Sequence, residues 1–155
     1  MNSSDLPSVC TDIEELIPHR APMRLVQTIT RIDDESIETA SVVQDTWPTA
    51  RAGWVRTLVL IELVAQTAAA LQGWRERHER EGGAGGLLVG VREAKLHEAA
   101  LPVGAQLRCF AHISHRAPNY LAFEGRVEDT EGTQWLSGSI QAFRLEAPIE
   151  SGDSS

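Results

Sequence analysis

The most informative stretch of this chain is TLVLIELVAQTAAALQGW, residues Thr57 to Trp74. As a helix of about 25 Å it carries apolar residues on nearly every side, so the pattern predicts a helix that the rest of the protein surrounds. Glu62 and Gln66 interrupt this pattern at an i, i+4 spacing and therefore share one helix face. A carboxylate in such surroundings needs a partner, a ligand or a raised pKa, because burying an unpaired charge is very costly. Glu62 is thus the first candidate functional residue.

Length and charge restrict the classes of function. The chain has 155 residues, with 14 Lys and Arg against 22 Asp and Glu, which gives a net charge of -8. One domain of this length buries a real core. The acidic balance argues against general nucleic-acid binding, which neutralises phosphates with basic side chains. Neither a signal peptide nor a membrane span is indicated, so a cytoplasmic protein is expected. Cys10 and Cys109 show no metal-ligand spacing, and no metal or other cofactor is indicated.

The segments around the helix favour strands. Residues 1–11 and 148–155 are polar and expected to be flexible, which leaves a single domain over residues 12–147. A short helix is expected at 13–16, capped by Thr11 or Asp12, and a stiff loop at 18–23. Gly73 and the charged segment 75–81 mark the end of the long helix. Strands are expected over 24–32, 36–43, 86–95, 106–114, 120–127 and 135–145, a loop over 44–56, and a turn at 102–104. This order predicts an α+β fold with an antiparallel sheet curled around one helix.

Three motifs resemble the (3R)-hydroxyacyl-acyl-carrier-protein dehydratases. PHRAPMRLV (18–26) is similar to their PHR-x-P-x-x-L-V opening, ELVAQ (62–66) to their E-x-x-AQ helix motif, and GLLVGV (86–91) lies where their third strand would be. The resemblance spans most of residues 12–145 and is closest to the dehydratase-like subunits of aryl polyene pigment pathways. It implies the hotdog fold, in which an antiparallel sheet wraps one long buried helix.

The resemblance also implies a site. In that family a loop histidine acts with the helix carboxylate of the other subunit of a dimer. The carboxylate carries over to Glu62, but no residue between Ser36 and Leu71 is a histidine. Dehydration of a 3-hydroxyacyl thioester needs a base, an acid near the hydroxyl and a polarised carbonyl. We expect Glu62, with a raised pKa, to be the acid and Gln66 to orient it or the substrate. The base then comes from a histidine-bearing partner or from His19.

Further residues of the loop before the helix are candidates for binding. Thr57 falls where a glycine of the family lends its N–H to the thioester carbonyl, unless Gly53 serves a shifted loop. Trp54 is expected to pack or to contact an acyl or aryl group. Arg51 and Arg56 are candidate contacts for the acyl carrier protein, because guanidinium groups bind phosphate and carboxylate well.

A dimer, with a second copy or with a histidine-bearing dehydratase, is expected because an exposed sheet edge invites pairing.

The sequence also leaves two other functions open. The missing loop histidine favours a non-catalytic subunit that binds an acyl group or stabilises a partner, whereas the retained Glu62 argues against it. A hotdog thioesterase, with Glu62 activating water, is the other alternative.

Overall fold

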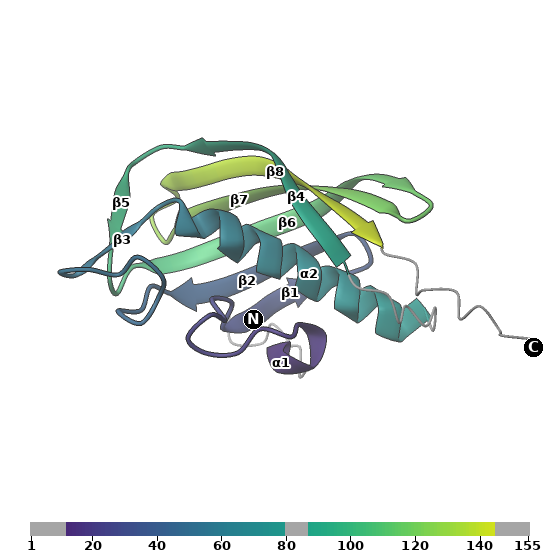
Figure 1. Cartoon of the computed structure of the whole chain (residues 1–155), viewed down its shortest axis with the longest axis horizontal. Coiled ribbons are helices and arrows are strands. Elements are labelled where there is room, and N and C mark those ends of the chain that lie inside the picture. Colours follow the sequence, from purple (N-terminus) through teal and green to yellow (C-terminus); the bar gives the residue numbers. More distant parts are fainter. Residues whose placement is uncertain (1–11, 80–86, 145–155) are drawn as a thin grey trace, which may run out of the picture.

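The computed structural model describes residues 12–79 and 87–144, in which a long helix lies across one face of an antiparallel sheet (Figure 1). The helices are α1 (Ile13–Leu16) and α2 (Val59–Glu79). The strands are β1 (Thr28–Ile32), β2 (Ser36–Val42), β3 (Trp54–Arg56), β4 (Leu87–Leu96), β5 (Ala100–Pro102), β6 (Gln106–Ala117), β7 (Tyr120–Asp129) and β8 (Gln134–Arg144). Six of them form the main sheet in the order β1-β2-β6-β7-β8-β4, which confirms the predicted α+β arrangement.

The long predicted strands are present, but the first begins later than expected. β1 starts at Thr28 instead of Arg24, because the N–H groups of Leu25 and Val26 donate to the side chain of Gln66 on α2 and not to a neighbouring strand. β1 and β2 then form the predicted antiparallel hairpin. The termini predicted to be flexible lie outside the described residues.

Two short strands were not predicted. β3 lies in the segment that was expected to be a loop, and β5 ends in the expected turn at 102–104. They pair with each other through Trp54↔Pro102, Val55↔Leu101 and Arg56↔Ala100, as a separate small sheet near the start of α2 (Figure 1). Three residues are too few to show a strand period in sequence. This small sheet fixes the entry into α2.

The core lies between α2 and the sheet. Leu60, Leu63 and Leu71 of α2 are fully buried, and Phe123 of β7 packs in the same cluster. The helix continues through Gly73, which was expected to mark its end. A Cβ atom there would lie 2.5 Å from the carbonyl oxygen of Leu16, so Gly73 allows α1 to pack closely on α2.

One stripe of α2 stays open, so the helix is not surrounded on every side. Leu58, just before it, is 57% exposed, and Ile61, Ala65 and Ala69 are only partly buried. β4, at one edge of the sheet, pairs only with β8 and exposes Val91 among its side chains. Neither described helix is both long enough and apolar enough to span a membrane.

Candidate active site

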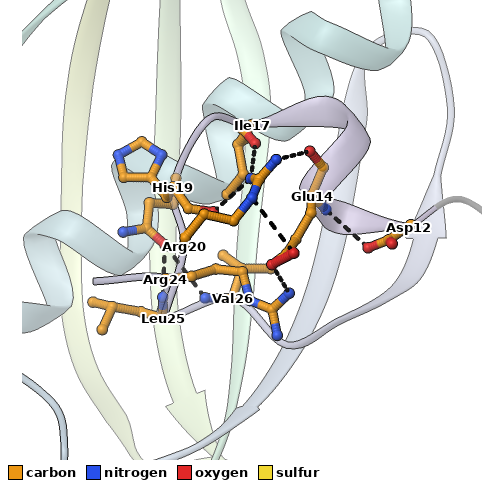
Figure 2. Close-up of polar contacts among 9 residues, drawn as sticks. Asp12, Glu14, Ile17, His19, Arg20, Arg24, Leu25 and Val26 are labelled. Atoms are coloured by element: carbon orange, nitrogen blue, oxygen red, sulfur yellow. Dashed lines mark hydrogen bonds and ion pairs between the residues drawn. The ribbon is translucent and has the colours of Figure 1, made fainter. Parts of the chain in front are cut away.

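The loop after α1 is held in place by one arginine. The guanidinium of Arg20 donates hydrogen bonds to the carbonyl oxygens of Glu14, Ile17 and His19 at 2.9–3.0 Å (Figure 2). Its Nε also lies 3.5 Å from the carboxylate of Glu14, and this carboxylate accepts a 3.0 Å hydrogen bond from the guanidinium of Arg24. The backbone at His19 is therefore fixed from within the loop. The sequence did not predict that Arg20 would hold this loop in place. The arginine of the PHR motif was the one feature that could have indicated it.

Gln66 ties the same loop to α2. Its side chain is buried, and its Oε1 accepts from the N–H groups of Leu25 (2.8 Å) and Val26 (3.4 Å). Its Nε2 donates to the carbonyl oxygen of Met23 (2.7 Å) and to Oε1 of Glu62 (3.0 Å). All the hydrogen-bonding capacity of this carboxamide is used inside the chain. Gln66 therefore orients Glu62 and has no group left to bind a substrate.

His19 and Glu62 meet where the loop crosses α2. Nε2 of His19 lies 3.3 Å from Oε1 of Glu62, the oxygen that also accepts from Gln66. Nδ1 of His19 is buried and has no hydrogen-bond partner. Oε2 of Glu62 has no polar partner in the described part of the chain. One carboxylate oxygen is thus anchored twice and the other is free.

The expected burial of Glu62 is wrong for the single chain. Its side chain is 44% exposed, and that of His19 is 33% exposed. The reason is that Glu62 lies on the open stripe of α2, which no other part of the described chain covers. The site therefore lies at the surface of this chain.

Thr57 and Gly53 both have structural contacts. The N–H of Thr57 donates to the carbonyl oxygen of Ala99 at 3.1 Å, and its hydroxyl donates to that of Glu98. Gly53 has a φ of +83° in the turn before β3, and its carbonyl oxygen accepts from Val103 at 2.9 Å. Both residues join the start of α2 to β5 and its flanking segments. The N–H of Thr57 is consequently not free for a substrate oxygen.

Arg51, Trp54 and Arg56 form an exposed patch beside this entry. Arg51 and Trp54 exchange two backbone hydrogen bonds, of 2.8 and 3.0 Å, across a tight turn. Trp54 is 54% exposed and lies on the same side of β3 as Arg56, opposite the buried Val55. Neither arginine has an acidic partner within residues 12–79 and 87–144. The patch adjoins an open groove of about 600 Å³ between residues 56–58 and 96–99.

A second histidine-glutamate pair lies on β6 and β7. Nε2 of His112 is 3.4 Å from Oε2 of Glu124, and the two side chains are 52% and 62% exposed. Among the described residues no amide or loop segment anchors this pair, which makes it a control for the first one. The described residues contain no cluster of three His, Cys, Asp or Glu side chains able to hold a metal ion.

Comparison with known proteins identifies the family. The chain matches the family model of ApeP-like proteins, described as ApeP dehydratase, over residues 11–151. The chain belongs to the ApeP-like dehydratase family. The resemblance inferred from the three motifs is therefore confirmed. No curated protein matched this ApeP-like chain.

Solved structures show the fold of this ApeP-like chain. The dehydratase heterocomplex ApeI:P from Xenorhabdus doucetiae is similar with a TM-score of 0.76 at 20% identity, covering 86% of this chain and 90% of that one. PH1136 from Pyrococcus horikoshii gives 0.62 at 20% identity, covering 79% and 85%. A hypothetical thioesterase with coenzyme A from Streptococcus pneumoniae TIGR4 gives 0.60 at 14% identity, covering 76% and 84%. These likenesses confirm the hotdog fold.

Proposed function

We propose that this chain supplies the carboxylate of a composite dehydratase site, which converts a 3-hydroxyacyl thioester on an acyl carrier protein to the 2-enoyl thioester. The loop histidine of a partner dehydratase supplies the base. The observation that carries this proposal is the anchored Glu62: Oε1 is held by His19 and Gln66, and Oε2 is free at a half-exposed surface.

The chemistry needs only groups that such a site would bring together. The partner's histidine removes a proton from C2 of the acyl group while the carboxyl group of Glu62, covered by the partner subunit, gives a proton to the hydroxyl on C3, which leaves as water. The C2–C3 double bond forms as the C3–O bond breaks. The proton on the histidine then returns to Glu62 through solvent. Because the N–H of Thr57 is used by Ala99, the N–H groups of Leu58 and Val59 at the helix start are the proposed donors to the thioester oxygen.

His19 fits a positioning role better than the role of base. A base must present a nitrogen lone pair to the substrate, within about 3 Å of the proton that it abstracts. In His19, Nε2 faces Glu62 and Nδ1 is buried. His19 therefore holds the carboxylate of Glu62, and the base comes from another subunit.

The surface around the site suits a protein partner. Met23, Leu58 and Leu96 are large apolar side chains, between 40% and 57% exposed, and they belong to the segments that surround Glu62 and the α2 entry. Exposed apolar side chains that gather at one place mark an interaction surface. β4 offers a strand edge for pairing. The similar structure from Xenorhabdus doucetiae is itself a dehydratase heterocomplex, which supports a heterodimer.

The patch of Arg51, Trp54 and Arg56 is the proposed contact for the carrier protein. The chain is acidic overall, so an acidic carrier protein needs a local cationic surface. Two arginines that have no acidic partner in the described part of the chain flank an exposed indole, next to the groove that leads to the start of α2. An aromatic anchor between guanidinium groups is a common composition for a binding surface.

Mass spectrometry of a 3-hydroxyacyl-carrier protein tests the proposal. The substrate is incubated with this chain alone, with a histidine-bearing dehydratase from the same organism, with both, and with both after the partner's loop histidine is replaced by alanine. We expect the chain alone to be inactive, and the mixture to release water only when that histidine is present. Water loss by this chain alone would contradict the composite site. Release of the free acid would instead support the thioesterase, and a partner that is stabilised but not activated would support the non-catalytic subunit.

A further inference from the structure

The face of the sheet that points away from α2 carries a pocket of its own (Figure 1). On β7, Val127 is fully buried and a Cβ on Gly125 would touch Val64 of α2, so the residues that alternate with them lie on the outer face. The pocket there has a volume of about 330 Å³, within the range of small-molecule sites, about 300–1,000 Å³. Its charged and hydroxyl-bearing lining includes Glu93, Lys95, Arg126, Ser137 and Ser139.

A β-bulge in β4 builds one wall of this outer pocket. Val91 pairs with a buried residue of β8, and the register then shifts before Glu93, so that Arg92 is an extra residue. In an unbroken strand Glu93 and Lys95 would lie on the same face as Val91, but the bulge turns them to the outer face. A Cβ on Gly138 of β8 would collide with the carbonyl oxygen of Glu93, so this glycine lets the bulged strand approach closely. Bulges often lie beside functional sites, where they redirect side chains.

The polar groups of the pocket are ordered by the strand register. Lys95 and Arg126 are the partners of Ser137 on its two sides, and Glu93 is a partner of Ser139. Glu93 and Lys95 lie 3.8 Å apart, and their side chains are 63% and 71% exposed. An ion pair this long and exposed contributes little, so both groups can accept a further partner. Two cations thus lie beside one hydroxyl, and a carboxylate lies beside the other.

The side of the pocket toward β6 is already arranged within the chain. The guanidinium of Arg126 lies 4.0 Å from the ring centroid of Phe110, and its Nε is 3.7 Å from Glu128. Stacking on the ring limits the side-chain freedom that Arg126 would otherwise lose when it binds a ligand. Glu124 is engaged by His112 at 3.4 Å. Glu93 is therefore the carboxylate of this pocket with the weakest partner.

From this arrangement we infer that the outer pocket binds a small zwitterion of the α-amino acid type. Its carboxylate lies between Lys95 and Arg126, and its ammonium group lies on Glu93. In an α-amino acid the nitrogen and the nearer carboxylate oxygen are about 3 Å apart. This is close to the 3.8 Å between the charges of Glu93 and Lys95, so the two opposed dipoles can lie side by side.

The charges of the pocket decide against ligands of one sign. A simple anion would meet the carboxylate of Glu93, and a simple cation would meet two basic side chains, so a ligand with both charges fits best. The pocket lies on the opposite face of the sheet from Glu62, and the inference does not rest on the proposed function. Pairing of β4 with a partner strand would leave this face open, because side chains stand perpendicular to the sheet.

Isothermal titration calorimetry tests the inference, with the chain in the assembly in which it is purified. The probes are L-leucine, L-glutamine and L-phenylalanine, each also as its N-acetyl acid, which lacks the ammonium group, and as its amide, which lacks the carboxylate. We expect at least one free amino acid to bind with a Kd of about 1 mM or lower, and both blocked forms to bind at least about tenfold more weakly.

Variants place the binding in the pocket. Lys95→Gln should weaken it about tenfold, whereas Arg108→Gln, at an exposed arginine of the same sheet face, should leave it unchanged. Ser137→Leu should abolish binding because leucine fills the floor of the pocket. If Ser137→Leu fails to fold, Lys95→Gln still decides, because Lys95 is exposed.

Three results would overturn the inference. The first is a Kd above about 10 mM for all three free amino acids. The second is an N-acetyl acid that binds as tightly as the free amino acid, which would indicate a site for simple anions. The third is an affinity that survives Lys95→Gln. Because no turnover is measured, a chain that does not dehydrate can still pass this test, and an active enzyme can fail it.

Discussion

Replacing Gln66 by leucine should release the loop from α2 and remove much of the chain's free energy of unfolding. The side chains have similar size, but leucine cannot accept from the N–H groups of Leu25 and Val26, both in fully buried residues. A buried donor left without a partner costs about 1–3 kcal/mol, so the two together cost about 2–6 kcal/mol. The loss of the 2.7 Å contact to Met23 adds to this. A value near 4 kcal/mol would be a large part of the total stability of a typical domain, which is about 5–15 kcal/mol.

The assay is urea unfolding followed by circular dichroism, with Gln72→Leu as the matched control. Gln72 is also a buried glutamine of α2, but its Oε1 has no donor and its only hydrogen bond is long. We expect Gln72→Leu to change the free energy of unfolding by less than about 1 kcal/mol. Equal losses in the two variants, or a loss below about 1 kcal/mol in Gln66→Leu, would refute the conclusion that these hydrogen bonds hold the loop on α2.

Three further predictions concern packing, titration and reactivity. Gly73→Ala should destabilise the chain by about 1–3 kcal/mol in the same urea assay, because the new Cβ would lie 2.5 Å from the Leu16 carbonyl oxygen. An unchanged unfolding midpoint would contradict the close packing of α1 on α2. The hydrogen bond from the N–H of Glu35, together with those from Ser36, lowers the pKa of Asp33. For Asp129, burial raises the pKa, but hydrogen bonds from Thr133, Trp135 and Glu131 outweigh this effect and lower the pKa overall. Both carboxylates therefore contribute stability that is present above about pH 4 and lost as the pH falls through their folded pKa. In a variant with Asn at both Asp33 and Asp129, the free energy of unfolding should fall less steeply as the pH is lowered. An equally steep fall would count against these contacts. Burial raises the pKa of Cys109 to about 12, so in a Cys10→Ser background a thiol reagent should label it only after urea is added, and full labelling of the folded chain would disprove its burial.

The elements that sequence predicted well are those whose pattern repeats over many residues. The apolar run of α2 and the long strands of the sheet have such patterns. β3 and β5 were missed because three residues cannot show a period. The start of β1 was wrong because the backbone of Leu25 and Val26 bonds to a side chain of α2, a tertiary contact that local sequence does not encode.

The site was predicted in part, for similar reasons. The contact between Glu62 and Gln66 follows from their i, i+4 spacing. The contact of His19 with Glu62 joins distant segments, and only the match to the family's opening motif suggested that His19 lies near the site. The exposure of Glu62 depends on which stripe of α2 the sheet leaves open, and an apolar pattern on all sides does not show this. The unpaired acceptor of Gln72 likewise became visible only with its surroundings.

We propose that Glu62 supplies the acid of a composite site. The most direct test is the rate of water loss from a 3-hydroxyacyl-carrier protein by the complex of this chain with the proposed histidine-bearing partner, measured for Glu62→Gln and for Glu124→Gln. Both variants neutralise a glutamate paired with a histidine, but Glu124 lies on β7 in an unanchored, exposed pair. We expect Glu62→Gln to lower the rate by about a hundredfold or more while the complex stays assembled, and Glu124→Gln to leave it unchanged. An unchanged rate in Glu62→Gln would mean that Glu62 does not supply the acid.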